Sequence, residues 1–523
     1  MTEPQKPQRL LHDAPKLLPS EDSFGRAPFA KRLADSMLRM PADDGFVFAL
    51  SGPWGSGKTT AVNFVVHHLR EAKAAGTPIV IVHFNPWWFS GRSQLMLQFF
   101  QELGAALKVH DTGAGLARLG RRLGALSSAL KPVRLVPTLG PLLKEYQEVL
   151  AASAQAVGKA SKLARKDVHG IRDRIDAALR QQQARIIVII DDIDRLPGHE
   201  IRQLFQVVKA IADFPKTIYL LVFDRKVVVR SLGKVQAATG AAYLEKIIQA
   251  QLDIPMPDQS AIQKMLFEEL DGALAGTPEA LFDVDAWLNL YYGGVAPLVR
   301  TPRDVKRLVN AVALTYPAVV GEVNPVDFVG VQVLRLWAPT VYHYVQDHAD
   351  LLAGTTGANV AAPKLDAETK AVFNRHAKAV RAANREAISG IMGRMFPKWA
   401  AACSNSRYSY DSSSEWRRMR RVCSPECFRV YFALALGLGD VARAEMMEFI
   451  DKSSEQRACE QSLLSLVTRK EPDGTPRLRP FLDRLQDYAK QEVPESHIAQ
   501  IVSAVFNVGD ELVDADEWSH VFV

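Results

Sequence analysis

The sequence predicts an α/β protein with a mostly parallel sheet in its first half and helices almost throughout its second half. Uninterrupted apolar runs recur between helical patterns, and such runs are typical of strands that a parallel sheet buries on both faces. From residue 325 onward, apolar residues instead recur at helical spacing. The predicted strands occupy residues 46–50, 79–84, 186–190 and 217–223.

A glycine-rich stretch follows the first predicted strand and precedes a helical pattern. It reads GPWGSGKT and fits the phosphate-binding spacing G-x-x-x-x-G-K-[ST], which predicts a P-loop. Glycines let the backbone turn its N–H groups toward phosphate oxygens, while Lys58 is expected to hold the β and γ phosphates and Thr59 to ligate magnesium. The residues predicted to contact the nucleotide are Gly52, Pro53, Trp54, Gly55, Ser56, Gly57, Lys58, Thr59 and Thr60.

An acidic doublet ends the third predicted strand. A P-loop enzyme needs one carboxylate for its magnesium ion and a second that orients or deprotonates water. Asp191 fits the metal role, with Thr59, and Asp192 fits the role of catalytic base. The chain lacks the guanine-reading Asn-Lys-x-Asp pattern, so we expect magnesium-dependent hydrolysis of ATP rather than GTP.

Charged residues at two strand ends are candidates for reading the γ-phosphate. Asp224 ends the fourth predicted strand, where a polar residue can sense that phosphate or simply cap the strand. Arg195 lies too close to the acidic doublet along the chain to fold back readily onto its own site. We predict that Arg195 is an arginine finger acting on a neighbouring subunit, with Arg225 as the alternative.

A helix is predicted to begin at Thr301 and Pro302, since threonine is a good N-cap and proline suits the first helical position. It brings Arg303 and Arg307 onto one face. These arginines are either a sensor of the γ-phosphate or a solvated cationic face.

Residues 107–185 differ in composition from the rest of the chain. They hold 15 Lys and Arg against 6 Asp and Glu, whereas the whole chain has a net charge of only +6. Leucines at steps of three and four predict a basic amphipathic helix that carries Arg118, Arg121 and Arg122, and a second helix follows over residues 151–179. This insertion either packs on its own domain or contacts nucleic acid or an anionic membrane.

Composition restricts the class of protein. With 523 residues, of which 48% are hydrophobic, the chain can form several buried cores. No run of about 18 apolar residues predicts a membrane helix and no signal peptide is evident, so we expect a cytoplasmic protein. The four cysteines predict buried thiols rather than a metal site, and the basic stretch around Trp416 predicts either an exposed helix face or a contact for phosphate groups.

Several of these motifs together resemble the KAP family of P-loop NTPases, over residues 24–310. They are the P-loop, the aromatic run at residues 84–87, the string Asp191-Asp192-Ile193-Asp194-Arg195, the strand ending Phe223-Asp224-Arg225, and the stretch YLEKII at residues 243–248. The resemblance implies a STAND-like ATPase fold, ATP as the nucleotide, and roles in phage exclusion, mobile-element biology or membrane-proximal scaffolding.

The chain departs from many KAP proteins in one respect. Those proteins carry transmembrane helices between the P-loop and the acidic strand, but here residues 123–143 are interrupted by lysine, arginine and two prolines. We therefore expect any membrane contact to be peripheral.

The predicted organisation is an extended arm (1–23), a P-loop core (24–258) with its helical insertion (107–185), a helical sensor region (259–403) and a helical C-terminal domain (404–523). We expect an ATP-driven switch or assembly ATPase in bacterial anti-phage defence, with other protein subunits or further copies of the same chain as candidate partners. The alternatives are a DNA-stimulated motor or loader and a peripheral membrane scaffold that binds ATP.

Overall fold

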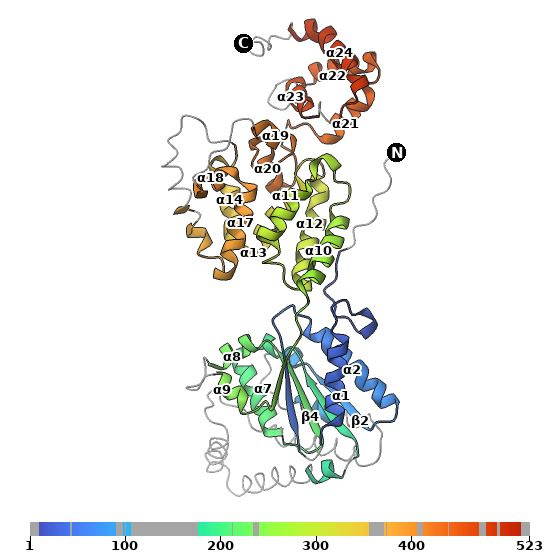
Figure 1. The fold of residues 1–523 in the computed structure, drawn as a ribbon, viewed down its shortest axis with the longest axis vertical. Helices are drawn as coiled ribbons and strands as arrows, with labels where there is room; N and C mark the ends of the chain where they lie inside the picture. The colour runs from blue at the N-terminus through green and yellow to red at the C-terminus, as the bar shows by residue number, and fades with distance from the viewer. Residues whose placement is uncertain are drawn as a thin grey trace, which may run out of the picture. The chain divides into compact units, whose positions relative to one another are not determined.

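The computed structural model describes residues 10–41, 44–89, 98–99, 101–105, 176–181, 183–211, 213–233, 240–354, 371–372, 374–404, 412–437, 439–469, 477–488 and 492–513. The chain divides into two compact units, one of residues 14–261 and one of residues 1–13 with 262–523 (Figure 1). Most of the predicted insertion at residues 107–185 lies outside the described residues.

The first unit is built on a five-stranded sheet. Every pair of neighbouring strands is parallel, and the order is β2-β3-β4-β1-β5. The strands are β1 (Phe46–Ser51), β2 (Ile79–Phe84), β3 (Arg185–Ile190), β4 (Thr217–Phe223) and β5 (Ala250–Asp253). All four predicted strands are confirmed, and β4 lies between the strand that leads into the P-loop and the strand that ends in the acidic doublet. The fold is therefore the predicted α/β core with a parallel sheet.

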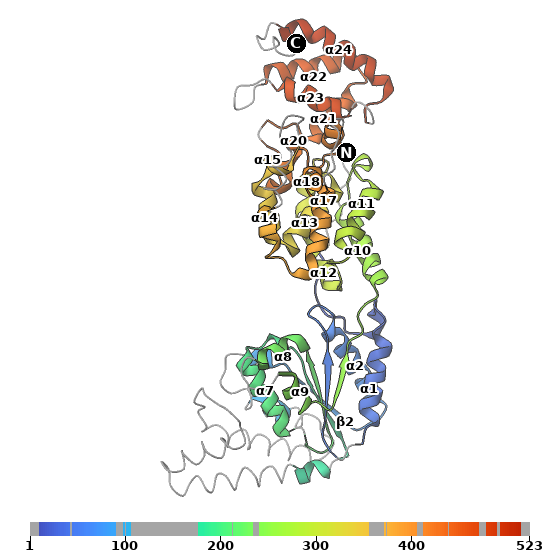
Figure 2. The same ribbon diagram turned by 60° about the vertical axis from the view of Figure 1, so that its left-hand side comes forward.

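Helices cover both faces of this sheet (Figures 1 and 2). On one face, α1 (Ala27–Arg39) and α2 (Lys58–Ala74) pack on strand residues such as Leu50 and Ile189. On the other, α7 (Gly198–Ile211), α8 (Arg225–Gly233) and α9 (Gly240–Glu245) pack on Ala49 and Val188. Since both faces are buried, the central strands need apolar residues at nearly every position, and β4 is buried along its whole length.

The described residues of the second unit form helices and the segments that connect them, with no strand among them. Its first helices are α10 (Gln259–Ala273), α11 (Val284–Leu290), α12 (Pro302–Thr315), α13 (Pro325–Trp337), α14 (Pro339–Asp347) and α15 (Ala349–Leu352). The next are α17 (Arg385–Met395), α18 (Pro397–Ser404), α19 (Ser412–Arg418) and α20 (Pro425–Ala433). The last four, which share a hydrophobic core, are α21 (Arg443–Lys452), α22 (Gln456–Thr468), α23 (Leu478–Tyr488) and α24 (Glu495–Val513).

The start of α12 is as predicted. The Thr301 hydroxyl accepts a hydrogen bond from the backbone N–H of Asp304, and the Asp304 carboxylate accepts one from the N–H of Thr301. This reciprocal capping box satisfies N–H groups that the helix itself leaves without partners.

No helix in the part of the chain that the structure describes is both long and apolar enough to cross a membrane.

A buried carboxylate joins the last four helices to the helices before them. Glu322 accepts hydrogen bonds from Arg420, which follows α19, from Arg484 of α23, and from the backbone N–H of Arg443 at the start of α21. The Arg443 guanidinium pairs in turn with Glu492, at 2.7 Å. Removing one member of such a buried network would leave an unpaired charge, so these contacts fix the packing of the C-terminal helices.

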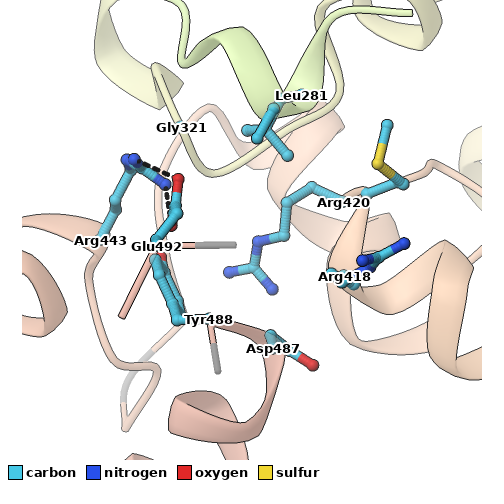
Figure 3. Close-up of a pocket in the computed structure, with 10 residues that line it drawn as sticks. Leu281, Gly321, Arg418, Arg420, Arg443, Asp487, Tyr488 and Glu492 are labelled. Carbon is cyan, nitrogen blue, oxygen red and sulfur yellow. Dashed lines mark hydrogen bonds and ion pairs between the residues drawn. The ribbon is translucent and has the colours of Figure 1, made fainter. Parts of the chain in front are cut away.

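The cavity beside this network is small. Figure 3 shows Arg420 pointing between Leu281 and Tyr488, with the Arg443–Glu492 pair at one side. The cavity holds about 30 Å³, room for no more than about two water molecules. A site for a small-molecule ligand needs several hundred Å³, so this cavity is too small for one.

The basic stretch around Trp416 is not an exposed helix face. Trp416 is buried, Arg417 pairs with Asp487 at 2.9 Å, and Arg421 pairs with Asp327 at 2.6 Å. The prediction of an exposed or phosphate-binding face was wrong because carboxylates distant in the sequence occupy these arginines. The prediction of buried thiols is confirmed for Cys423, Cys427 and Cys459.

Candidate nucleotide-binding site

The P-loop connects β1 to α2, and its backbone conformation requires glycine. Gly55 and Gly57 have φ angles of 83° and 82°, in the left-handed region that side chains with a Cβ rarely adopt. The helix α2 begins at Lys58 directly after Gly57. The first backbone N–H groups of α2 therefore belong to Lys58 and Thr59, where the helix dipole favours an anion.

Two polar side chains of the P-loop have environments that suit a phosphate ligand. The Ser56 hydroxyl is buried and has no hydrogen-bond partner among the described residues. The Lys58 ammonium is also buried. It lies 3.0 Å from the carbonyl oxygen of Gly52 and 3.8 Å from a carboxylate oxygen of Asp194. Since buried polar groups are normally paired, the Ser56 hydroxyl fits a ligand with oxygen acceptors.

The predicted metal ligands lie together. The Thr59 hydroxyl donates a 3.0 Å hydrogen bond to Asp191 Oδ2, across 132 positions of sequence. Burial, and then the neighbouring Asp192, raise the pKa of Asp191 to about 6. A hydroxyl and a buried carboxylate are oxygen ligands of the kind that magnesium prefers, so the residues present fit this ion.

The predicted catalytic base is held by two side chains. Asp192 has a φ of 60°, and its Oδ2 accepts a 2.9 Å hydrogen bond from the side-chain amide of Asn85. Its Oδ1 lies 2.8 Å from Nε of Arg195, which belongs to the same chain. Both carboxylate oxygens of Asp192 are thereby oriented. The Arg195 side chain is 46% exposed, and its predicted role as a finger in trans stays a prediction.

Asn85 was not among the residues that we expected to act at the site. The sequence does indicate that Asn85 lies near the acidic doublet, because Asn85 directly follows β2 and the carboxyl ends of parallel strands meet at one edge of a sheet. Its side-chain oxygen accepts a hydrogen bond from the backbone N–H of Trp87, which leaves the amide group directed to Asp192. Trp87 and Trp88 are both exposed.

Arg26 is a second residue that the sequence did not identify. It is only 3% exposed, and its Nε and Nη2 atoms have no hydrogen-bond partner among the described residues. Its guanidinium lies against Gly57, where any Cβ would collide with it. Burial lowers the pKa of Arg26, and nearby Asp22 opposes that shift. A buried guanidinium beside a phosphate-binding loop fits an anionic ligand at that loop.

The remaining predicted residues have other contacts. Asp224 accepts a hydrogen bond from the backbone N–H of Lys226, and Arg225 donates to Gln251 at 3.0 Å. Thr60 accepts a 3.2 Å hydrogen bond from the backbone N–H of Lys16, and Trp54 is 60% exposed.

Arg303 and Arg307 belong to the second unit. Arg303 forms an ion pair with Asp13, and the Arg307 guanidinium lies 5.6 Å from the ring centre of Trp337. Their predicted role as sensors stays a prediction.

A glycine-rich loop joins a parallel strand to a helix, and a lysine, a threonine and an acidic doublet lie at the same edge of the sheet. This arrangement defines a P-loop NTPase. The KAP family P-loop domain matches residues 26–319, more than half of the chain. The chain belongs to this family.

A curated relative is the phage T7 exclusion protein of Escherichia coli (strain K12). It is 24% identical over 452 residues, which cover 79% of this chain and 59% of the relative. The chain therefore spans less than two thirds of that protein's length.

Solved structures with some similarity include the ORC1 protein of Aeropyrum pernix in complex with DNA. It has 13% identity and a TM-score of 0.29, covering 70% of this chain and 82% of that chain. CDC6P of Pyrobaculum aerophilum has 10% identity and a TM-score of 0.26, covering 94% and 87%. Similarity at these identities and TM-scores carries no argument about function.

Proposed function

We propose that this protein is a magnesium-dependent ATPase that acts as a nucleotide-driven switch or assembly ATPase. The observation that carries the proposal is the contact between Thr59 and Asp191, with Lys58 and Asp192 at the same edge of the sheet. These are the groups that phosphoryl transfer to water requires: a phosphate cradle, oxygen ligands for a cation, and a carboxylate for the attacking water.

Each side chain has a distinct task in this proposal. Lys58 neutralises charge on the β and γ phosphates, and Ser56 adds a hydrogen bond from within the loop. Thr59 and Asp191 would hold magnesium, which adds positive charge at the transferring phosphoryl group when bound. Asp192, oriented by Asn85 and Arg195, accepts a proton from water or aligns it for attack.

Phosphate release under steady-state conditions tests the enzymatic part. We expect the purified protein to release phosphate from ATP with magnesium, and to lose this activity when EDTA removes the ion. GTP at the same concentration tests base selectivity. An ATP-binding protein with no phosphate release above a no-enzyme control would contradict the hydrolytic proposal.

The biological part of the proposal is defence against phage. It is supported by membership of the KAP family and by the relative named for phage T7 exclusion. Helical regions beyond the P-loop core offer surface for protein partners, including further copies of this chain. We expect cells that express the wild type to reduce phage plating by tenfold or more, and cells with equal amounts of Asp192→Asn to plate phage like the empty vector. Equal plating with wild type and vector, across a phage panel, would contradict the defence role.

The DNA-stimulated and membrane-scaffold alternatives depend on the basic insertion, most of which lies outside the described residues. Two measurements distinguish these alternatives from the proposed function. Stimulation of phosphate release by DNA would support a motor or loader, and flotation with anionic liposomes would support a peripheral scaffold.

Asn85 provides a prediction about how the base is held. Asn85→Ala removes the hydrogen bond to Asp192 Oδ2, so we expect kcat to fall roughly tenfold to a hundredfold while ATP affinity stays near the wild-type value. Phosphate release and equilibrium binding of a fluorescent ATP analogue give the two quantities. His83→Ala, two positions earlier on the chain, is a control that leaves this hydrogen bond in place. If Asn85→Ala keeps the wild-type kcat, then Asn85 does not position the base.

A further inference from the structure

Three carboxylates follow β3 along the chain, and each contacts a different partner. Asp191 accepts a hydrogen bond from Thr59, and Asp192 is held by the two side chains described above. Asp194 instead forms an ion pair with Lys58, whose ammonium lies 3.8 Å from Asp194 Oδ2. All five residues belong to the first unit. Asp194 therefore acts on the candidate nucleotide site through the lysine of the P-loop.

Both members of this ion pair are buried. The side chains of Lys58 and Asp194 are 9% and 8% exposed. The ammonium also donates to the carbonyl oxygens of Gly52 at 3.0 Å and Pro53 at 3.5 Å, but these acceptors carry no net charge. A buried cation whose ion-pair partner is removed is strongly destabilising. The Asp194 carboxylate is therefore the anion that compensates the buried charge of Lys58.

The fold holds Asp194 more firmly than it holds the Lys58 ammonium. Asp194 is the middle residue of the 3₁₀ turn η3 (Ile193–Arg195), which directly follows the acidic doublet. Ile193 is fully buried in the core, and its carbonyl accepts a 3.2 Å hydrogen bond from the backbone N–H of Leu196. Lysine carries its ammonium on a flexible stem of four carbons. When the pair separates, the ammonium is therefore the group that moves.

We propose that Asp194 is a positioning residue that competes with nucleotide phosphate for the Lys58 ammonium. The inference rests on the proposed function, since it requires a nucleotide at the P-loop. A phosphate group and the Asp194 carboxylate are both anions that attract the same ammonium, and they repel each other. Binding of the nucleotide weakens the ion pair, and the pair forms again when the nucleotide leaves. Asp194 thereby lowers nucleotide affinity and keeps binding reversible.

Asp194→Asn tests the competition, because the amide keeps the size of the side chain and one oxygen acceptor while it removes the charge. We expect the Kd for a non-hydrolysable ATP analogue to fall about fivefold or more. In phosphate release, KM should fall as well, while kcat stays within about threefold of the wild-type value. Asp258→Asn is the matched control, since it removes the same charge from an exposed carboxylate that is hydrogen-bonded to Ser260.

Binding in EDTA separates the competition from magnesium ligation. Bound magnesium neutralises part of the phosphate charge, so the repulsion between Asp194 and the phosphates is greater without the ion. We expect the gain in affinity of Asp194→Asn to be at least as large in EDTA as with magnesium. An unchanged or higher Kd in Asp194→Asn, with or without magnesium, would overturn the competition. A wild type that binds no analogue would instead contradict the proposed function.

The melting temperature gives a second readout, which needs no nucleotide. Asp194→Asn leaves the Lys58 ammonium without its anion, and Lys58→Met leaves the Asp194 carboxylate without its cation, whereas the double variant leaves neither charge. We expect both single variants to melt below the wild type, and the double variant to lose less than the two single losses combined. Circular dichroism establishes that the variants are folded before heating. Strictly additive losses would show that the two residues do not act as a pair and would overturn the inference.

Discussion

Lys58→Ala is expected to abolish ATP binding, whereas Asp192→Asn is expected to bind ATP like the wild type and to hydrolyse it at least about a hundredfold more slowly. The two effects differ because the residues act on different groups. Lys58 is the buried cation of the P-loop, so its loss leaves phosphate charge without a partner. Asp192 acts on water, and a general base typically contributes a factor of about 10² to 10⁴.

Equilibrium binding of a fluorescent ATP analogue and steady-state phosphate release separate these outcomes. Asp194→Asn is the informative comparison, because Asp194 is the neighbouring carboxylate and lies 3.8 Å from the Lys58 ammonium. We expect its effect to fall on binding more than on turnover. If Asp192→Asn hydrolyses ATP at the wild-type rate, the assignment of the base is wrong and Asp194 becomes the candidate.

Local sequence was enough to predict the centre of the candidate site. The P-loop depends on glycines at fixed spacing, and the acidic doublet depends on one buried strand, so each is determined within a short segment. The parallel sheet then brings the ends of β1 and β3 to one edge, and the contact between Thr59 and Asp191 follows. The position of β4 between those strands comes from topology, and no local pattern specifies it.

The sequence could not show contacts that join distant segments. Arg26 belongs to the site only because the turn at residues 22–26 folds against Gly57, and nothing around Arg26 in the sequence indicates that turn. For the arginines after Trp416, the prediction from sequence was wrong in the opposite sense, because it assigned no distant partners to side chains that have them. Their local composition indicates a solvated basic face, but Glu322 and Asp327, each more than 90 positions earlier, pair with Arg420 and Arg421.

Arg195 has two candidate roles in the site. Within its own chain, its Nε lies 2.8 Å from Asp192 Oδ1, which suits a residue that positions the base. Its side chain is nevertheless 46% exposed, so a guanidinium directed to a neighbouring subunit is also compatible with its location. The two roles differ in one measurable respect. A finger in trans makes activity depend on assembly, whereas a positioning residue acts within each subunit.

Mixing two inactive variants is expected to restore hydrolysis if Arg195 is the finger. Arg195→Ala keeps an intact P-loop and Lys58→Ala keeps an intact Arg195, so a mixed oligomer places a working site beside a working finger. A cation at the transferring phosphoryl group can contribute about 10³-fold or more, so each variant alone should be nearly inactive and the mixture clearly active. Specific activity of the wild type should also rise with protein concentration. No recovery of phosphate release, although mass photometry detects mixed oligomers, would exclude the finger and leave Arg195 as the partner of Asp192 within one chain.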